Sequence, residues 1–355
     1  MEDRKTILNI DDLSVSFAVK KNVNRVIRNC SLKLYEGEIL AIVGESGSGK
    51  SVITKSFVGM LDKNGFIASG KVEFEGQDLT AFKTEKEWLQ IRGSKIAMVM
   101  QDPMTALNPL MTVGKQIEEA VVLHQGLKGE EAKQESIKML AKVGITEPER
   151  RYKQYPHELS GGQRQRVVIA IACACKPKIL ICDEPTTALD VTIQNQILAL
   201  IKQMKDELGM TVIIITHDMG VVANIADRVA VMYAGQFVEI GMVEEVFYDA
   251  WHPYTWALLA AIPQLGKKGD ELPSIEGTPP NRYFEVKGDP FAPRNKMALA
   301  IDYLEEPPWF DITETHKAKT WYLDPRCKDI KRPEHITHFH ERLEEIYGKE
   351  ETANE

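Results

Sequence analysis

The sequence GESGSGKS at residues 44–51 constrains the fold of this chain more than any other stretch. It follows the apolar run ILAIV and precedes a segment with helical spacing, which predicts a buried strand, a loop and a helix in succession. Glycines in the loop allow backbone conformations that side chains would forbid, so its N–H groups can point inward around phosphate oxygens. Lys50 supplies a full positive charge and Ser51 a hydroxyl for Mg²⁺. The stretch therefore predicts a site for the phosphates of a nucleotide.

We call residues 44–51 the phosphate loop. The expected N-terminus of the following helix adds partial positive charge to the same site. The alternative, a Gly/Ser-rich turn with an incidental lysine, is disfavoured by the strand pattern before the loop and the helix pattern after it. The residues expected to contact the nucleotide here are Gly44, Glu45, Ser46, Gly47, Ser48, Gly49, Lys50, Ser51 and Val52.

A pair of acidic residues ends another apolar run, ILICDE at residues 179–184. Ligands of open α/β sheets bind at the carboxyl ends of the strands, where this run places both carboxylates. Asp183 is expected to hold Mg²⁺, directly or through water, and Glu184 to accept the proton of an attacking water. The alternative is two carboxylates that cap a strand before the turn at Pro185, and the presence of the phosphate loop makes it the weaker interpretation.

The order of apolar runs predicts the fold class. Runs at residues 96–100 and 211–216 are separated by amphipathic helical patterns, which indicates an α/β fold with helices on the faces of the sheet. Residues 6–18 alternate between apolar and polar and are predicted to form an edge strand. The stretch from about 85 to 170 has helical spacing and is interpreted as a helical subdomain inserted into the α/β core. Prolines cluster after about residue 250, which predicts a separate, loop-rich C-terminal region.

Length and composition limit the remaining possibilities. A chain of 355 residues suggests two units, which we place at residues 1–250 and 251–355. The formal net charge of −8 argues weakly against a surface built for nucleic acid, but not against ATP, whose site needs only local positive groups. The longest apolar stretches are far shorter than the roughly 20 residues of a membrane-spanning helix. The chain is therefore not expected to cross a membrane alone.

The most specific stretch is HELSGGQRQRVVIAIACA at residues 157–174, in which LSGGQ precedes a long helical run. Ser160 stands at the expected N-cap, and Gly161 and Gly162, followed by Gln163, leave backbone N–H groups open at the positive end of the helix. This is a second predicted anion site, far along the chain from the first. One ATP cannot easily use both sites within one subunit. The economical arrangement is a two-fold dimer, with each ATP between the phosphate loop of one chain and the LSGGQ of the other.

Five motifs in order resemble the nucleotide-binding subunits of ABC transporters over roughly residues 6–245: GESGSGKS, LSGGQ, ILICDE, TALD at 187–190 and THD at 216–218. Each pattern is modest alone, but five in this order make a chance match negligible. The resemblance implies a P-loop NTPase core of the ABC type with an inserted helical subdomain. It also implies ATP and Mg²⁺ as ligands, ATP hydrolysis as the reaction, and a second homologous ATPase subunit as partner.

The resemblance implies roles at four further positions. Gln101 resembles the loop glutamine that senses the γ-phosphate and Mg²⁺, and His217 resembles the switch histidine that contacts the γ-phosphate. Asp190 resembles the aspartate that communicates between the two sites, although an N-cap of the next helix is an alternative role. Phe17 lies where the family often stacks an aromatic ring on adenine, the alternative being a core or edge phenylalanine. The expected catalytic residues are Glu184, His217 and Gln101, and the expected Mg²⁺ ligands are Ser51, Gln101 and Asp183.

Three more segments resemble ATPase subunits of oligopeptide and dipeptide permeases, including their C-terminal extension: residues 104–117, HPYTWALLAAIP at 252–263 and IEGTPP at 275–280. The resemblance implies peptide import, in a complex with a second, different ATPase subunit, two transmembrane permease subunits and an extracellular peptide-binding protein. It implies a peripheral place on the cytoplasmic face of the membrane and no nucleic-acid partner. Taken alone, the HPYT sequence could simply begin a helix with His252 near the cap.

The C-terminal extension departs from its family in one respect. Many such extensions hold an iron–sulfur cluster through four cysteines, in a pattern like G-C-x-F-x-P-R-C, whereas this chain has GDPFAPRN at residues 288–295. Asp289 and Asn295 stand at the first two cysteine positions, and by a looser alignment Asp302 and Thr320 stand at the others. Thiolates hold such clusters, and one remaining cysteine cannot do so. We therefore expect no cluster, and an extension held by packing or by a partner.

Three alternatives stay open. The same ATPase could power the uptake of nickel or another small solute, because the ATPase subunit does not touch the substrate. A soluble ABC-type ATPase of DNA repair or of ribosomes typically carries a long coiled-coil insertion or two cassettes, and this chain has one cassette and no strongly basic arm. A P-loop kinase or transferase is the third, and it leaves LSGGQ without a role.

Overall fold

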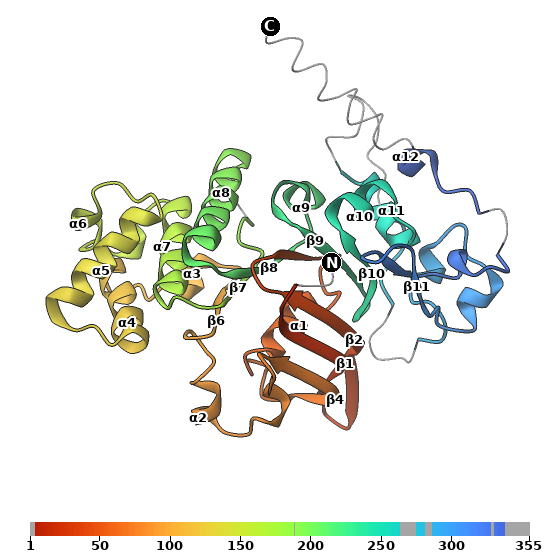
Figure 1. The fold of residues 1–355 in the computed structure, drawn as a ribbon, viewed down its shortest axis with the longest axis horizontal. Coiled ribbons are helices and arrows are strands. Elements are labelled where there is room, and N and C mark those ends of the chain that lie inside the picture. Colours follow the sequence, from red (N-terminus) through yellow and green to blue (C-terminus); the bar gives the residue numbers. More distant parts are fainter. Residues whose placement is uncertain (1–3, 188, 263–274, 281–285, 328–329, 338–355) are drawn as a thin grey trace, which may run out of the picture.

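The computed structural model describes residues 4–187, 189–262, 275–280, 286–327 and 330–337. In this part of the chain two β-sheets meet near the centre, a group of helices lies at one end, and the C-terminal region lies at the other (Figure 1). Among the described helices, none has both the length and the apolar character required to span a bilayer.

The larger sheet contains the strands that the apolar runs predict. Among the described residues its order is β11-β12-β10-β9-β3-β8-β7-β6. Its parallel strands are β3 (Ile39–Val43), β6 (Ile96–Val99), β7 (Ile179–Asp183), β8 (Thr211–Thr216) and β9 (Arg228–Tyr233). Every residue of β3, β7 and β8 is buried, as expected for parallel strands covered on both faces. The predicted α/β fold is confirmed.

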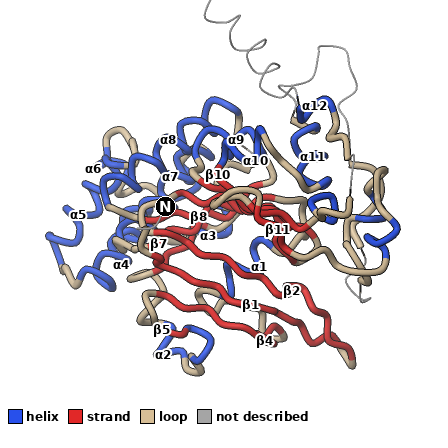
Figure 2. The backbone as a smooth tube through the Cα atoms, turned by 45° about the vertical axis from the view of Figure 1, so that its right-hand side comes forward, coloured by secondary structure: helices blue, strands red, loops and turns tan. Residues whose placement is uncertain are grey.

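The smaller sheet has four strands in the described chain, in the order β2-β1-β4-β5. They are β1 (Thr6–Val19), β2 (Asn22–Tyr35), β4 (Gly65–Phe74) and β5 (Gln77–Asp78), and Figure 2 shows the first three extending away from the larger sheet. The prediction of an edge strand at residues 6–18 is wrong, because β1 pairs with both β2 and β4. Alternating polarity reports a half-buried strand and does not report its neighbours.

The helical region, residues 103–174, lies between β6 and β7 in the chain. It contains α3 (Pro103–Ala106), α4 (Val113–Gln125), α5 (Gly129–Lys142), α6 (Pro148–Arg151) and α7 (Gly161–Ala174). The sequence predicts the insertion from about residue 85, whereas β6 falls within that range and lies in the larger sheet. The continuous apolar run of β6 suits a strand covered on both faces.

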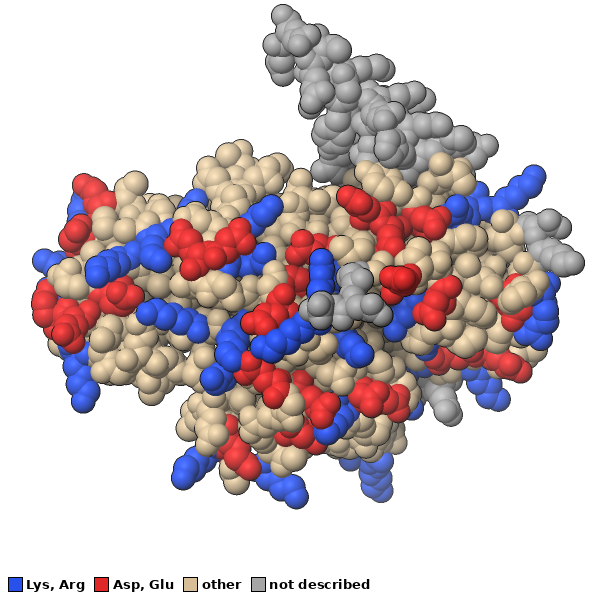
Figure 3. All heavy atoms as spheres, viewed as in Figure 1, with Lys and Arg blue, Asp and Glu red and all other residues tan. Residues whose placement is uncertain are grey.

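Four other α-helices of the described chain precede β9: α1 (Lys50–Ser56), α2 (Glu85–Trp88), α8 (Val191–Leu208) and α9 (Met219–Ile225). Helix α8 packs with the helical region in one hydrophobic core, to which Ile197 and Leu140 contribute. Helix α1 packs between the two sheets, where Ile53 and Ile27 belong to a second core. The charged side chains on the face in Figure 3 are mixed in sign, so this face does not offer a basic surface for nucleic acid.

The C-terminal region continues the larger sheet instead of forming a detached unit. The region adds strands to the edge of the sheet at β10 (Gln236–Met242), which α10 (Val243–Tyr248) follows. Its own elements are α11 (Pro253–Ala260), β11 (Trp309–Asp311), β12 (Lys317–Lys319) and α12 (Glu334–Thr337). Strand β12 pairs antiparallel with β10, and β11 pairs with β12. The sequence predicts a charged helix or tail over residues 335–355, of which residues 338–355 lie outside the described residues.

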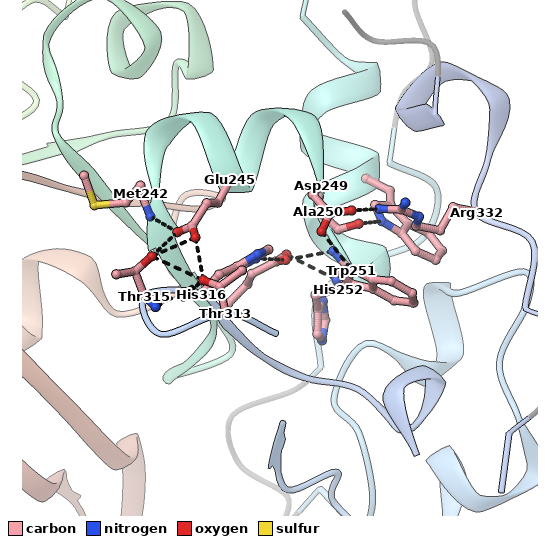
Figure 4. Close-up of polar contacts among 12 residues, drawn as sticks. Met242, Glu245, Asp249, Ala250, Trp251, His252, Thr313, Thr315, His316 and Arg332 are labelled. Atoms are coloured by element: carbon pink, nitrogen blue, oxygen red, sulfur yellow. Dashed lines mark hydrogen bonds and ion pairs between the residues drawn. The ribbon is translucent and has the colours of Figure 1, made fainter. Parts of the chain in front are cut away.

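A buried carboxylate of β10 joins the C-terminal region to the sheet through Trp251, His252 and His316, which Figure 4 labels. Glu239 of β10 accepts hydrogen bonds from the backbone N–H groups of Trp251 (2.7 Å) and His252 (3.2 Å), and its Oε1 lies 2.9 Å from Nε2 of His316. The side chains of Glu239 and His316 are both fully buried. Burial lowers the pKa of His252 to about 3, so its neutral Nδ1 accepts the N–H of Tyr254. The backbone N–H groups of Trp251 and His252, just before α11, are therefore satisfied by Glu239 of β10, which also pairs with His316 beside β12.

Glu245 of α10 makes a second link in the same view. Its carboxylate accepts hydrogen bonds from the hydroxyls of Thr313 (2.5 Å) and Thr315 (2.7 Å), which lie in the turn between β11 and β12. Arg332 pairs with Asp249, and its guanidinium lies 4.7 Å from the ring centre of Trp251. The extension is thus held by polar contacts at Glu239, Glu245 and Asp249 as well as by sheet pairing.

Glu239→Gln should destabilise the protein, because the amide has one acceptor oxygen for three donor groups and would point its own N–H₂ at a donor. We expect a loss of about 1–3 kcal/mol in the free energy of unfolding, measured by chemical denaturation of the full-length chain. Glu244→Gln, an exposed position on α10, is the matched control. Equal denaturation midpoints for the two variants would contradict the role of Glu239.

Candidate active site

The phosphate loop connects β3 to α1. At two of its positions only glycine fits. Gly44 has φ 153°, and a Cβ there would lie 2.1 Å from the carbonyl oxygen of Met232. Gly49 has φ 113°, and a Cβ there would lie 2.7 Å from Cδ1 of Ile27. Both the backbone conformation and the available space therefore require glycine. The loop is wrapped tightly against β9 and β2, which leaves its inner side for a ligand.

Lys50 lies within the phosphate loop. Its ammonium donates hydrogen bonds to the carbonyl oxygens of Gly44 (2.6 Å) and Glu45 (3.0 Å). Burial lowers the pKa of Lys50, and the nearby Glu184 and Asp183 oppose that shift. Hydrogen bonds between two charged groups are stronger than those to neutral carbonyls, so a phosphate oxygen can replace either partner.

Ser51 and Asp183 lie 132 positions apart in the chain and meet at the start of α1 and the end of β7. The Ser51 hydroxyl donates to Oδ1 of Asp183 at 3.0 Å. Burial raises the pKa of Asp183, and the bond from Ser51 opposes this shift. A bound divalent cation would favour the ionised carboxylate, and hydroxyl and carboxylate oxygens are ligands that Mg²⁺ prefers. The pair therefore fits a magnesium site.

Glu184 is the point where the predicted catalytic residues converge. Its Oε2 accepts hydrogen bonds from Nε2 of Gln101 (3.0 Å) and from the hydroxyl of Thr187 (2.9 Å). Its Oε1 lies 3.3 Å from Nδ1 of His217. Glu184 has φ 47°, in the left-handed region that few residues other than glycine adopt. The carboxylate is therefore held in a strained, well-defined position between an amide and an imidazole.

The contact between Thr187 and Glu184 is not among those that the sequence predicts. Thr187 stands three residues after Glu184, and its backbone N–H also bonds to the carbonyl oxygen of Glu184. The repeated threonines in EPTTALD were the available signal, since a hydroxyl after a tight turn often bonds back to the chain. The neighbouring Ala188, within the predicted TALD motif, lies outside the described residues.

The LSGGQ residues begin α7, in the helical region, and do not belong to the cluster around Glu184. Ser160 is the N-cap: its hydroxyl accepts the N–H of Gln163, and the Gln163 side chain accepts the N–H of Ser160 in return. Ser160 and Gly161 are exposed, and Gly162 is half-buried against Ile193. The first turn of this 14-residue helix therefore presents its N-terminus toward solvent.

Asp190 and Phe17 keep both of their predicted interpretations. Asp190 is the N-cap of α8, and its Oδ1 accepts the N–H of Ile193 at 2.9 Å, while the residue stays exposed. Phe17 pairs with Asn24 and Gly65 in the smaller sheet. Its ring packs where a Cβ on Gly65 would lie, 2.7 Å away. The half-buried ring leaves a surface on which a base could stack.

A cavity of about 410 Å³ borders the phosphate loop. The loop supplies one wall through Glu45, Ser46, Gly47 and Ser48, and strand β2 supplies another through residues that include Arg25, Val26 and Arg28. The third wall comes from the C-terminal region, through Pro279, Pro280 and Glu306. This volume is typical of a site for a small ligand. The extension thus reaches the edge of the predicted nucleotide site.

The four positions where a cluster cysteine would stand in the family take part in hydrogen bonds. The buried Asp289 donates its N–H to the carbonyl oxygen of Asp302 and accepts the N–H of Phe291. The Asn295 amide donates to the hydroxyl of Tyr322 at 2.9 Å. Thr320 caps the turn that begins at Trp321, since its hydroxyl accepts the N–H of Tyr322. These side chains stabilise the extension through its own backbone, and the absence of a cluster remains a prediction.

Two family models match the chain. The model described as "ABC transporter" matches residues 27–187, and the model described as "Oligopeptide/dipeptide transporter, C-terminal region" matches residues 238–301. The first range holds the phosphate loop, LSGGQ and the acidic pair. The second begins in β10 and contains HPYT and the segment with Asp289 and Asn295.

Curated relatives are similar over nearly the whole chain. The oligopeptide transport ATP-binding protein AmiE of Streptococcus pneumoniae is 54% identical over 347 residues, which cover 98% of each chain. The dipeptide transport ATP-binding protein DppD of Lactococcus lactis is 49% identical and covers 96% of this chain and 98% of its own. The oligopeptide transport ATP-binding protein OppD of Bacillus subtilis is also 49% identical, over 97% and 96%.

Solved structures are similar to the ATP-binding core. The cassette MJ0796, in a dimeric post-hydrolysis state bound to ADP and Pi, matches with TM-score 0.59 and 28% identity over 66% of this chain and 98% of its own. CbiO1 of Clostridium perfringens, part of an ABC transporter complex, matches with TM-score 0.60 and 30% identity over 70% and 92%.

Asp289→Asn should raise stability at alkaline pH. Burial raises the pKa of Asp289 to about 7, so between pH 4 and 7 the folded state keeps a proton that the unfolded chain has lost. Stability is therefore lost as the pH rises through this window, while asparagine keeps the acceptor for Phe291 and has no proton to lose. We expect the variant to exceed the wild type by about 1–3 kcal/mol at pH 8 and to match it near pH 4.

Denaturation at several pH values measures this difference, and Asp62→Asn, at an exposed position, is the control. A difference from the wild type that does not change with pH would contradict the assignment to Asp289.

Proposed function

Because this chain belongs to the ATP-binding subunits of oligopeptide and dipeptide ABC transporters, we propose that it powers the uptake of oligopeptides across the cytoplasmic membrane. The chain is an ABC-type ATPase that binds and hydrolyses ATP. The near-complete coverage of peptide-transport relatives, including the C-terminal region, supports a peptide over another solute.

The observation that carries the catalytic proposal is the convergence on Glu184. A general base must lie within hydrogen-bond reach of the water that it activates, and it must be held there. Gln101 and His217 approach Glu184 from the ends of β6 and β8, at 3.0 Å and 3.3 Å. A water bound among these three side chains would lie near the phosphate loop, because Glu184 directly follows Asp183, which accepts the hydroxyl of Ser51 at 3.0 Å.

Hydrolysis then proceeds by in-line attack of this water on the γ-phosphorus. Glu184 accepts the water's proton, His217 and Gln101 orient the water, and Lys50 neutralises charge on the phosphate oxygens. Mg²⁺, held by Ser51 and Asp183 with Gln101 nearby, would share that neutralisation when bound. ADP and phosphate are the products, and no acceptor other than water is needed.

The exposed N-terminus of α7 supports a second subunit at each ATP. Ser160 and Gly161 face solvent in the helical region, away from the cluster around Glu184, so they are free to meet the triphosphate bound by another chain. We infer a pair of homologous ATPase subunits, with two different chains favoured by the resemblance to peptide permeases. Asp190, beside this surface at the start of α8, would communicate between the two sites.

The partners complete the proposal. Two transmembrane permease subunits would receive the motion of the helical region, and an extracellular binding protein would deliver the peptide. The chain would act at the cytoplasmic face of the membrane as a peripheral subunit. Purification of the tagged chain from solubilised membranes tests this arrangement, because permease subunits and a second ATPase should co-purify.

Glu184→Gln should lower the rate of ATP hydrolysis by the assembled complex by about 10²–10⁴-fold, because the amide cannot accept the proton of water. ATP binding should be retained. The same variant should fail to restore uptake of a labelled oligopeptide in cells that lack this chain. Glu149→Gln, an exposed position in α6, is the control and should behave as the wild type. Normal turnover by Glu184→Gln would show that another group is the base.

Ser160→Phe tests whether this chain closes the site of its partner. The bulky ring should block contact with the partner's ATP, so the complex should lose most of its hydrolysis while this chain still binds ATP at its own phosphate loop. Photolabelling with 8-azido-ATP and a phosphate-release assay measure the two properties separately. The dimer proposal would fail if the isolated wild-type chain hydrolysed ATP as fast as the complex.

A further inference from the structure

We propose that Arg294 and Tyr254 of the C-terminal region are positioning residues for ATP binding, which act by holding Glu45 of the phosphate loop. This role rests on the proposed function, since it takes the loop to be the site of the triphosphate. Tyr254 and Arg294 lie 209 and 249 positions after Glu45 in the chain, outside the motifs of the ATP-binding core.

Every polar group of Glu45 has a partner. Its backbone N–H donates to the hydroxyl of Tyr254 at 2.6 Å, and its carbonyl accepts the ammonium of Lys50 at 3.0 Å. Its carboxylate accepts two parallel hydrogen bonds from the Arg294 guanidinium, at 2.6 Å and 2.9 Å. Such bidentate pairs fix orientation as well as distance. Glu45 is therefore the joint between the loop lysine and two residues of the extension.

Arg294 is itself held rigidly. Only 4% of its side chain is exposed, and it also donates to the carbonyl oxygens of Glu276 (2.9 Å) and Ile275 (3.2 Å) and to the hydroxyl of Tyr233 (3.2 Å). The bonds to Glu45 raise the pKa of Arg294, which keeps the guanidinium charged. A side chain held by five hydrogen bonds to four residues can impose its position on the loop.

A cluster of aromatic rings, which includes Tyr254, packs beside the contact between the extension and Glu45. The rings of Tyr233, Tyr254 and Phe291 are buried and lie with their centres 4.5–5.4 Å apart. Tyr233 ends β9, next to Met232, whose carbonyl oxygen lies against Gly44. The cluster thus joins α11, the extension and the strand under the phosphate loop into one packed unit.

The charge of Glu45 explains why this contact matters for ATP. Glu45 lines the cavity beside the loop, and a carboxylate without a counter-ion would repel a triphosphate there. It could also draw Lys50 away from the phosphates. With Arg294 in place the carboxylate is neutralised, and Lys50 rests on backbone carbonyls that a phosphate can replace. Arg294 and Tyr254 thereby contribute to ATP affinity through Glu45.

Equilibrium binding of the fluorescent probe mant-ATP to the full-length chain tests the proposal. Arg294→Gln should weaken binding roughly tenfold, because it leaves the Glu45 carboxylate unpaired. Arg294→Lys keeps the positive charge but cannot form the two parallel hydrogen bonds to Glu45, and it should weaken binding roughly threefold. Tyr254→Phe loses only the hydroxyl and should also weaken binding roughly threefold. The double variant Glu45→Gln/Arg294→Gln should bind more tightly than Arg294→Gln alone, because the unpaired charge is gone.

Lys296→Gln is the matched control, since it breaks the exposed ion pair with Glu276 in the same segment and should leave affinity unchanged. Thermal unfolding of each variant identifies those that are folded. If the wild type does not bind the probe, the proposed function itself fails. If the wild type binds and the folded Arg294 and Tyr254 variants bind equally well, with only their stability reduced, these residues are structural and this inference alone is overturned.

Discussion

Parallel pairing of β3, β8, β7 and β6 is the constraint on which the active site depends. The carboxyl ends of these strands meet at one edge of the sheet, and each is followed by one part of the site: the phosphate loop, His217, the acidic pair and Gln101. The backbone ladder sets the spacing between these parts. The strained backbone at Glu184 is tolerated because its N–H bonds to Ile215 of β8, within the same ladder.

Much of this arrangement follows from local sequence. The buried strands, the loop between β3 and α1, and the cap at Ser160 each have a short-range signal in apolar runs, glycines or a capping residue. The neighbours of β1 do not, because strand order is decided by contacts between distant segments. The contact of Thr187 has no clear sequence signal for a different reason: a hydroxyl near an acid is common, and only the turn geometry shows that it bonds to Glu184.

The C-terminal region is a second case in which contacts between distant segments have no signal in the local sequence. Proline-rich composition predicts a separate unit, yet β12 continues the sheet of the core and Glu239 is buried between the two. Asp289, Asn295 and Thr320, which stand where we expect the cluster cysteines of the family, form hydrogen bonds within the extension. Polar contacts and an aromatic cluster therefore hold this region together in the described structure, and one of its arginines reaches the phosphate loop.

The pairing of Glu239 with His316 also bears on how the protein matures. The two residues are 77 positions apart, so a ribosome releases the carboxylate well before its imidazole partner emerges. Until then the acid keeps its hydration, because an unpaired charge in a dry interior is costly. The buried contacts of Glu239 at β10 can thus be completed only after His316 has emerged. The folding of β10 is thereby coupled to that of the C-terminal region, because the buried carboxylate of the one needs the donor groups of the other.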